Sequence, residues 1–321
     1  MVIFRFGRNR FNIPPGQILL LGVLFFLPVL SPPLFGWMSG LLAVPVCCLL
    51  QVNGAETGKK TLFFSLLVTG VGALLLQRLE FYLFLLTLVP LGIALHRGIA
   101  IKEPAVTSGG KGLAILGLTW VCFWGIYGAV TGVNPYSQLL QVIDLGFQQT
   151  LEVYGTKEAD LPPEMLLNLT SVTNVMREVF PRMLPGLLVS MVITTVWINI
   201  VLINSLTGRL TGRVPWGFYS TWKLPEPLVC LPIAGIAFLV FGKGFFQDAG
   251  GWLTMAAVLL YFFQGLAVFI SLLERWRVPY VVRIMLYAVL IIQSYGLILL
   301  AVLGLSDVWI DFRKQTNNNA R

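Results

Sequence analysis

The chain has 321 residues, of which 57% are hydrophobic and only 11% charged, and its formal net charge at pH 7 is +8. Soluble domains carry roughly 25% charged residues, so this composition excludes a water-soluble globule and indicates a protein dissolved in a lipid bilayer. The basic residues fall in short stretches between apolar runs, which is typical of cytoplasmic loops. We therefore expect the bilayer as the main partner and no binding to nucleic acid.

Apolar runs of membrane-spanning length recur along the chain. A helix needs about 17–25 apolar residues to cross roughly 30 Å of hydrocarbon, and isolated strands cannot satisfy their backbone groups in lipid. The sequence thus predicts an all-α, polytopic membrane bundle that forms a single integral-membrane domain over residues 1–321. We count about nine segments, with eight as the alternative, at 14–30, 33–51, 61–77, 80–96, 112–131, 183–204, 226–242, 252–273 and 284–305.

The distribution of Lys and Arg predicts the orientation. With a cytoplasmic N-terminus, 14 of the 22 basic residues fall inside, whereas the count becomes even if the segment 14–30 does not span. The bias favours nine spans and a multi-pass protein of the bacterial inner membrane. The basic C-terminal stretch "DFRKQTNNNAR" would then lie outside, which keeps an even number of spans open.

One long hydrophilic insertion, at about 132–182, is predicted to face outward. Its first half carries an apolar stripe from Tyr136 to Tyr154 at helical spacing, and Gly155 is a plausible helix end. Asp160 ahead of two prolines marks the start of a second helix. The insertion is either a helical hairpin that caps the bundle or an element that docks a partner protein.

The sequence offers no catalytic or metal-binding pattern. The stretch "AVTSGGKG" at 105–112 lacks the first Gly and the Ser/Thr of a phosphate-binding loop. His96 is the only histidine, and the four cysteines lack the spacing of a zinc site. We therefore predict no enzymatic activity, no metal and no cofactor.

Uncharged polar residues inside the apolar segments are the candidates for a binding site. Asn199, Gln264 and Gln293 each lie within a predicted span, where polar groups are costly and often functional. They form either interhelical hydrogen bonds or a polar pocket near the middle of the membrane.

The stretch "STWKLPEPLVC", residues 220–230, concentrates polar and rigid residues ahead of an apolar run. Trp222 and Lys223 are suited to the membrane interface. Pro225 and Glu226 are suited to the first turn of a helix, where the carboxylate complements the positive end of the helix dipole. The sequence predicts an interfacial anchor followed by a helix start.

Four motifs resemble the C-terminal half of the YybS-like family, namely "TWKLPEPLV", "YFFQGLAV", "RVPYVVRIMLYAVL" and "LGLSDVWIDFRK". That family comprises bacterial inner-membrane proteins of unknown function and is distantly similar to the S components of energy-coupling-factor importers. The resemblance implies a helical bundle that binds or helps to move a small molecule, although 16–30 lacks the Ala-x-x-x-Ala typical of S components. The alternative is a non-transporting scaffold that docks an envelope or cytoplasmic partner through 132–182 or 206–225.

Overall fold

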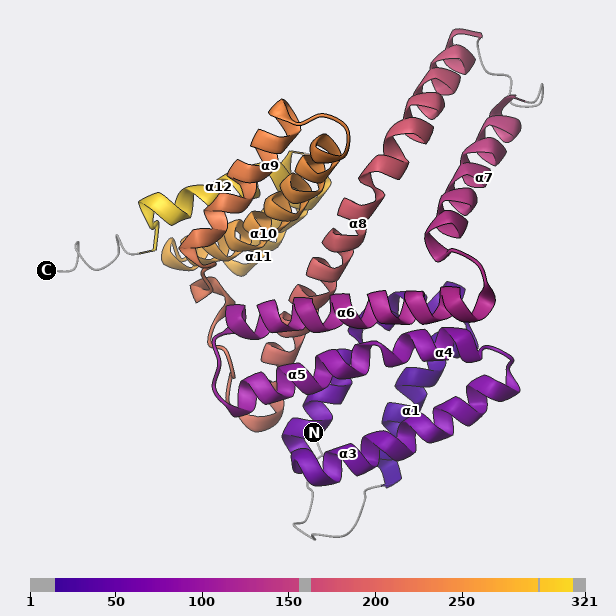
Figure 1. Ribbon diagram of the computed structural model, residues 1–321. Coiled ribbons are helices and arrows are strands. Elements are labelled where there is room, and N and C mark those ends of the chain that lie inside the picture. The colour runs from indigo at the N-terminus through magenta and orange to yellow at the C-terminus, as the bar shows by residue number, and fades with distance from the viewer. Residues whose placement is uncertain (1–14, 156–162, 294, 314–321) are drawn as a thin grey trace, which may run out of the picture. The chain divides into compact units, whose positions relative to one another are not determined.

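The computed structural model describes residues 15–155, 163–293 and 295–313, and every regular element in these ranges is helical (Figure 1). The all-α prediction is therefore confirmed. The chain divides into two compact units: unit 1 is Met1–Thr119 with Thr194–Trp222, and unit 2 is Trp120–Ile193 with Lys223–Arg321.

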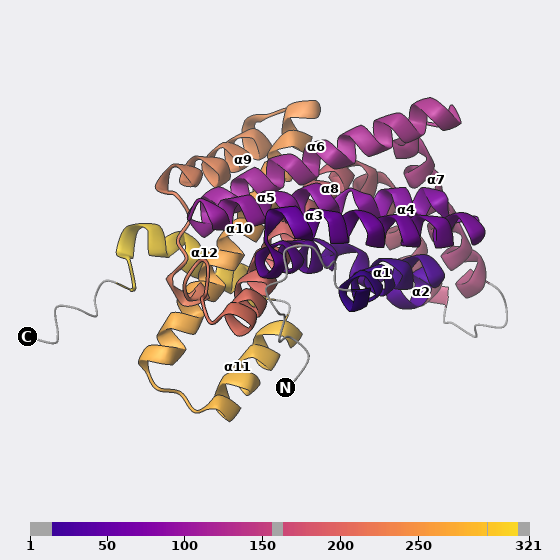
Figure 2. The same ribbon diagram turned by 90° about the horizontal axis from the view of Figure 1, so that it is seen from below.

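Unit 1 is built around α1 and α3, which pack against each other, and α5, which packs on α3. Figures 1 and 2 show α1 and α3 lying side by side. The hydroxyls of Ser65 and Thr69 donate hydrogen bonds to the carbonyls of Ile18 and Gly22, at 3.0 and 3.1 Å. The elements are α1 (Pro15–Leu30), α2 (Pro32–Phe35), η1 (Gly36–Leu41), α3 (Ala43–Leu75), α4 (Leu79–Leu86), α5 (Leu88–Ala100), the first part of α6 (Ala105–Thr131), the last part of α8 (Pro163–Thr211) and η3 (Tyr219–Thr221).

The helix α3 contains a sharp turn at Gly54. This residue has φ 77° and ψ 165°, a conformation outside the helical region that glycine adopts without a steric penalty. Beyond the turn, a Cβ on Gly58 would lie only 2.8 Å from the Leu50 side chain. Residues eight apart on a straight helix would be about 12 Å apart, so the chain reverses direction here.

Unit 2 contains α10, which packs against α9 and α12. Glycines permit these close approaches: a Cβ on Gly250 would lie 2.7 Å from the carbonyl carbon of Phe238. Gly265 lies directly against the carbonyl of Leu300, and Gly304 against that of Tyr261. The elements are the rest of α6, α7 (Pro135–Gly155), the first part of α8, η4 (Glu226–Val229), α9 (Cys230–Phe241), α10 (Phe245–Arg275), α11 (Tyr280–Ile292) and α12 (Gly296–Ile310).

The hydrophilic insertion forms α7 and the first part of α8, which run side by side (Figure 1). An ion pair of 2.6 Å joins Asp144 to Arg177, and the rings of Phe147 and Phe180 meet edge to face. The second helix of the insertion is not a separate element, because α8 continues without a break from Pro163 to Thr211.

The structure does not support the predicted count of eight or nine spans. Five helices among the described residues are long and apolar enough to cross a membrane, or six if the pair Pro15–Leu30 and Pro32–Leu41, bent by 114°, forms one span. Three predicted segments do not become spanning helices. The segment 33–51 is divided among α2, η1 and the short arm of α3, the segment 226–242 yields only a short helix, and 284–305 is broken between α11 and α12.

Candidate functional site

Asn199 is fully buried in unit 1 and ties α8 to the end of η1. Its side-chain nitrogen donates hydrogen bonds to the carbonyls of Gly40 and Thr195, at 2.6 and 2.7 Å. The first bond crosses between elements far apart in sequence, so this amide fixes the packing of helices within unit 1.

Gln264 is buried in unit 2, with 3% of its surface exposed. Its Oε1 accepts a hydrogen bond from the backbone N–H of Leu224, and its Nε2 donates one to Oδ2 of Asp307, both at 3.2 Å. Gln293, by contrast, lies at the end of α11 with an exposed side chain. Gln264 and Gln293 therefore do not share a buried site, and Asn199 belongs to the other unit.

Asp307, a residue that the sequence analysis missed, is the most buried charged side chain of this region. It is 0% exposed, and Nη2 of Arg313 donates to its Oδ2 at 3.1 Å. Its Oδ1 is also buried and has no hydrogen-bond partner among the described residues. The predicted ninth segment ended at 305, just before this residue. A carboxylate in the apolar run "LLAVLGLSDVWI" is itself a signal, because a charge there requires a partner.

A second ion pair lies beside this one, between Lys223 and Asp311, at 3.3 Å. Together these groups join the backbone at 223–224 to α10 and to the C-terminal end of α12. We call the set the α10–α12 polar cluster. It consists of Lys223, Gln264, Asp307, Asp311 and Arg313.

The structure describes all four residues of the predicted anchor and helix start, Trp222, Lys223, Pro225 and Glu226. Trp222 donates from its indole to the carbonyl of Trp216 at 2.9 Å, and its ring packs edge to face on Tyr219. Pro225 is extended, with φ −61° and ψ 136°, and a 3-10 turn begins at Glu226 and leads into α9. Lys223 therefore acts through an ion pair, in addition to any contact with headgroups.

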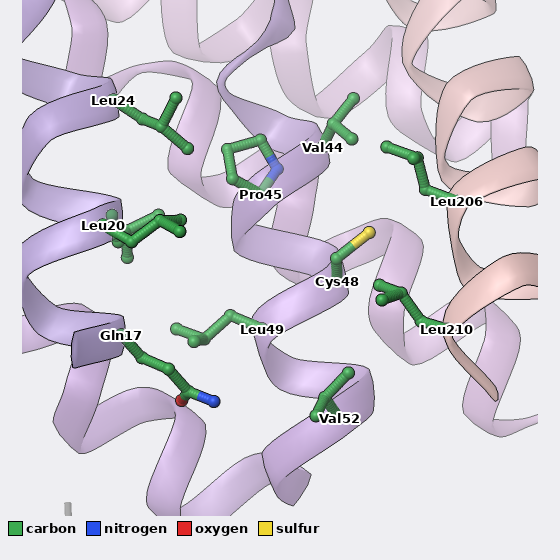
Figure 3. Close-up of a pocket in the computed structure, with 11 residues that line it drawn as sticks. Gln17, Leu20, Leu24, Val44, Pro45, Cys48, Leu49, Val52, Leu206 and Leu210 are labelled. Atoms are coloured by element: carbon green, nitrogen blue, oxygen red, sulfur yellow. The ribbon is translucent and has the colours of Figure 1, made fainter. Parts of the chain in front are cut away.

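An apolar pocket of about 280 Å³ lies in unit 1 between α1, α3 and the end of α8 (Figure 3). Among the described lining residues, only Gln17 and Cys48 have polar side-chain atoms, and the sulfur of Cys48 points toward α8 in Figure 3. The pocket is lined by Gln17, Leu20, Leu21, Leu24, Val44, Pro45, Cys48, Leu49, Val52, Leu206 and Leu210.

The pocket is open along one side. Leu20, Leu206 and Leu210 line it, yet they remain 52%, 38% and 42% exposed. At one end Gln17 is hydrogen-bonded to Asn53, so the amide at this end is already paired. An opening framed by leucines faces the hydrocarbon of a membrane more readily than water.

The same end of unit 1 is strongly basic. Gln17 is hydrogen-bonded to Asn53, and Gln51 donates to the His96 carbonyl, so the start of α1, the turn of α3 and the end of α5 lie together. The end of α8 lies on the same pocket, which both Val52 and Leu210 line. Glu103 binds Lys111 there, next to the start of α6. Seven exposed basic residues stand against two acidic ones, Glu56 and Glu103, a net charge of +5 among the described residues. The basic residues are Lys59, Lys60, Arg97, Lys102, Lys111, Arg209 and Arg213.

Within the described ranges, no group of three or more His, Cys, Asp or Glu side chains could hold a metal ion. A family model described as "predicted membrane protein (DUF2232)" matches residues 19–308. Neither the curated proteins nor the solved structures gave a match. The resemblance to importer S components stays a prediction.

Proposed function

The chain belongs to the DUF2232 family of predicted membrane proteins, and we propose that it binds a small molecule with an apolar portion, which enters from the bilayer. The observation that carries this proposal is the open pocket between α1, α3 and α8. Its volume of about 280 Å³ is close to the lower end of small-molecule pockets, roughly 300–1,000 Å³. A slender ligand, or one that stays partly outside, suits this volume.

The distribution of polar groups favours an apolar ligand over a polar one. Of the amides that could have formed a polar pocket, Gln264 uses both its oxygen and its nitrogen, and Asn199 its nitrogen, in hydrogen bonds to neighbouring segments. In the pocket itself, the amide of Gln17 is paired with Asn53. A sugar or a charged metabolite would find few partners on these walls and would lose its hydration.

The proposal also covers the location of the protein and its role in the cell. We place the protein in the bacterial inner membrane with a cytoplasmic N-terminus, supported by the basic end of unit 1. The role is binding, or a step in transport by a bundle similar to an S component, without catalysis, since the sequence carries no catalytic motif.

Photolabelling tests the proposal. Purified protein in detergent is irradiated with a diazirine fatty acid, and labelled peptides are identified by mass spectrometry. We expect labelling at 44–52 and 206–210, competed by unlabelled fatty acid. Leu206→Trp should fill the pocket and suppress this labelling. Leu188→Trp is the matched control, because both leucines lie on α8 and are 38% exposed. If Leu206→Trp leaves the labelling of 44–52 and 206–210 unchanged, the proposal is contradicted.

A second candidate function is a scaffold that docks a partner protein through the insertion. Its support is the set of apolar side chains left exposed on α7 and α8, such as Val142 at 61% and Val175 at 54%. The other predicted docking segment, 206–225, is folded back on α8, where Asn204 bonds Gly217 and Trp216. Stoichiometric co-purification of an envelope protein, lost in Val142→Ser/Val175→Ser at unchanged abundance, would support this function.

A further inference from the structure

Resting on the proposed function, we infer that the ligand of the pocket is an anionic phospholipid. One acyl chain occupies the space between α1, α3 and α8, and the phosphate lies at the basic end of unit 1. The inference rests on the shape of the pocket, on its side opening, and on the position of the basic residues relative to it.

An acyl chain fits the pocket for two reasons. The walls are apolar along their length, from Leu24 near one end to Val52 at the other. The exposed leucines at positions 20 and 206 leave the side open, so a chain can enter laterally while the rest of the lipid stays in the bilayer.

The apolar walls alone cannot select a ligand. Lipid tails in the surrounding membrane are as apolar as leucine, so transfer of a chain from bilayer to pocket gains little. Preference for one lipid must therefore come from its polar end. The pocket ends at Gln17 and Val52, beside the turn of α3.

Basic side chains stand at that end on the element that forms the third wall. Arg209 immediately precedes the lining residue Leu210, and Arg213 follows just beyond the end of α8. Both are exposed, and neither has an ion pair among the described residues. Guanidinium groups bind phosphate oxygens with paired, charge-assisted hydrogen bonds. A phosphate held there would place its acyl chain at the pocket's open side.

The basic residues at this end could also serve only to orient the protein in the membrane. The experiment must distinguish that role from lipid binding. Orientation in the membrane requires only a number of positive charges on one side, wherever they stand. A lipid site requires them next to the pocket. Removing two charges at the end of α8 should therefore weaken the preference for anionic lipid, whereas removing two charges at the end of α5 should not.

The experiment is native mass spectrometry of the full chain in neutral detergent with equimolar phosphatidylglycerol and phosphatidylcholine of identical acyl chains. The wild type should retain phosphatidylglycerol over phosphatidylcholine by roughly tenfold, since each nearby basic residue favours anionic lipid severalfold. Arg209→Gln/Arg213→Gln should reduce this preference to near one. Arg97→Gln/Lys102→Gln removes two charges from the same end of unit 1, one on the last turn of α5 and one just beyond it, and should keep the preference. Leu206→Trp should reduce the binding of both lipids.

Each result bears on one claim. Equal retention of the two lipids by the wild type, with binding still lost in Leu206→Trp, overturns this inference and leaves the proposed function intact. An equal loss of preference in the α5 and α8 variants also overturns it, because the preference would then follow total charge. No effect of Leu206→Trp on either lipid overturns the proposed function itself. If the double α8 variant does not fold, Arg209→Gln alone should give an intermediate preference, and an unchanged one overturns the inference.

Discussion

The side chain of Gln264 donates a hydrogen bond to Oδ2 of Asp307 at 3.2 Å, and so joins α10 to α12 inside unit 2. The two residues are 43 positions apart in sequence and are 3% and 0% exposed. Arg313 reaches the same carboxylate oxygen. These bonds join Gln264 and Arg313 to one oxygen of Asp307, while Oδ1 of Asp307 has no partner among the described residues. The α10–α12 polar cluster is therefore a structural element of unit 2.

Replacing Gln264 by Leu should lower the stability of unit 2. The change removes the acceptor for the Leu224 N–H and a donor to Asp307, and a buried group left unpaired costs about 1–3 kcal/mol. The free energy of unfolding can be measured by SDS titration in mixed micelles. Gln293→Leu is the control, because Gln293 is exposed, and it should change stability by no more than about 0.5 kcal/mol. An equal effect of the two substitutions would show that Gln264 has no special structural role.

Replacing Arg313 alone should lower the free energy of unfolding more than replacing Asp307 and Arg313 together. Arg313→Gln leaves the buried carboxylate without its cation, and loss of one partner from a buried pair costs about 3–5 kcal/mol. Adding Asp307→Asn removes the stranded charge and should restore a large part of that loss. The same SDS titration on both single variants and the double variant measures the coupling. Additive effects would mean that the two groups do not interact in the folded protein.

The contact between α10 and α12 should tolerate no side chain at Gly265. A Cβ there would overlap the backbone carbonyl of Leu300, and the backbone of α12 cannot rotate away as a side chain could. Gly265→Ala should therefore destabilise the protein by at least about 1–3 kcal/mol, the range found for overpacked cores. Gly251→Ala on the same helix is the control, since its nearest neighbour would be at an ordinary 3.7 Å. Thermal unfolding in detergent compares the two, and a stable Gly265→Ala would be inconsistent with this packing.

Hydropathy was enough to predict where helices lie but not where they break. The segments 112–131, 183–204 and 252–273 fall inside α6, α8 and α10. The helix breaks at Gly54 and Gln293 were not predicted. Averaged hydropathy does not register the positive φ that turns α3 at Gly54. The polar Gln293 ends α11 instead of lying within a continuous span, so a polar residue in an apolar run can also mark a break.

The candidate site was predictable only in part, for a related reason. A polar residue in an apolar run is visible in sequence, which is why Gln264 was found. The partner Asp307 would have been found by extending the last segment by two residues. The pocket could not be predicted, because Leu20, Leu49 and Leu206 resemble ordinary lipid-facing residues until the fold brings them together. Such a pocket depends on long-range packing, which residue type and spacing do not record.

Cysteine labelling in intact cells should place the basic end of unit 1 in the cytoplasm. Glu56 and Glu80 form a matched pair, since both are exposed glutamates of unit 1. Glu56 lies at the turn of α3, at the basic end. Glu80 lies two residues after Arg78, which donates hydrogen bonds to the carbonyls of Val29 and Leu30 at the far end of α1. Positive charge is retained on the cytoplasmic side, so a membrane-impermeant maleimide should label Glu80→Cys in intact cells and Glu56→Cys only after lysis.

The background variant for this labelling replaces the four native cysteines by alanine, a small residue that suits the buried position of Cys47. Arg213→Cys should behave as Glu56→Cys does, since the pocket is lined both by residues next to the turn of α3 and by residues at the end of α8. Labelling of positions 56 and 213 from opposite sides would contradict the arrangement of unit 1, whereas labelling of both from outside would reverse the orientation and leave the arrangement intact.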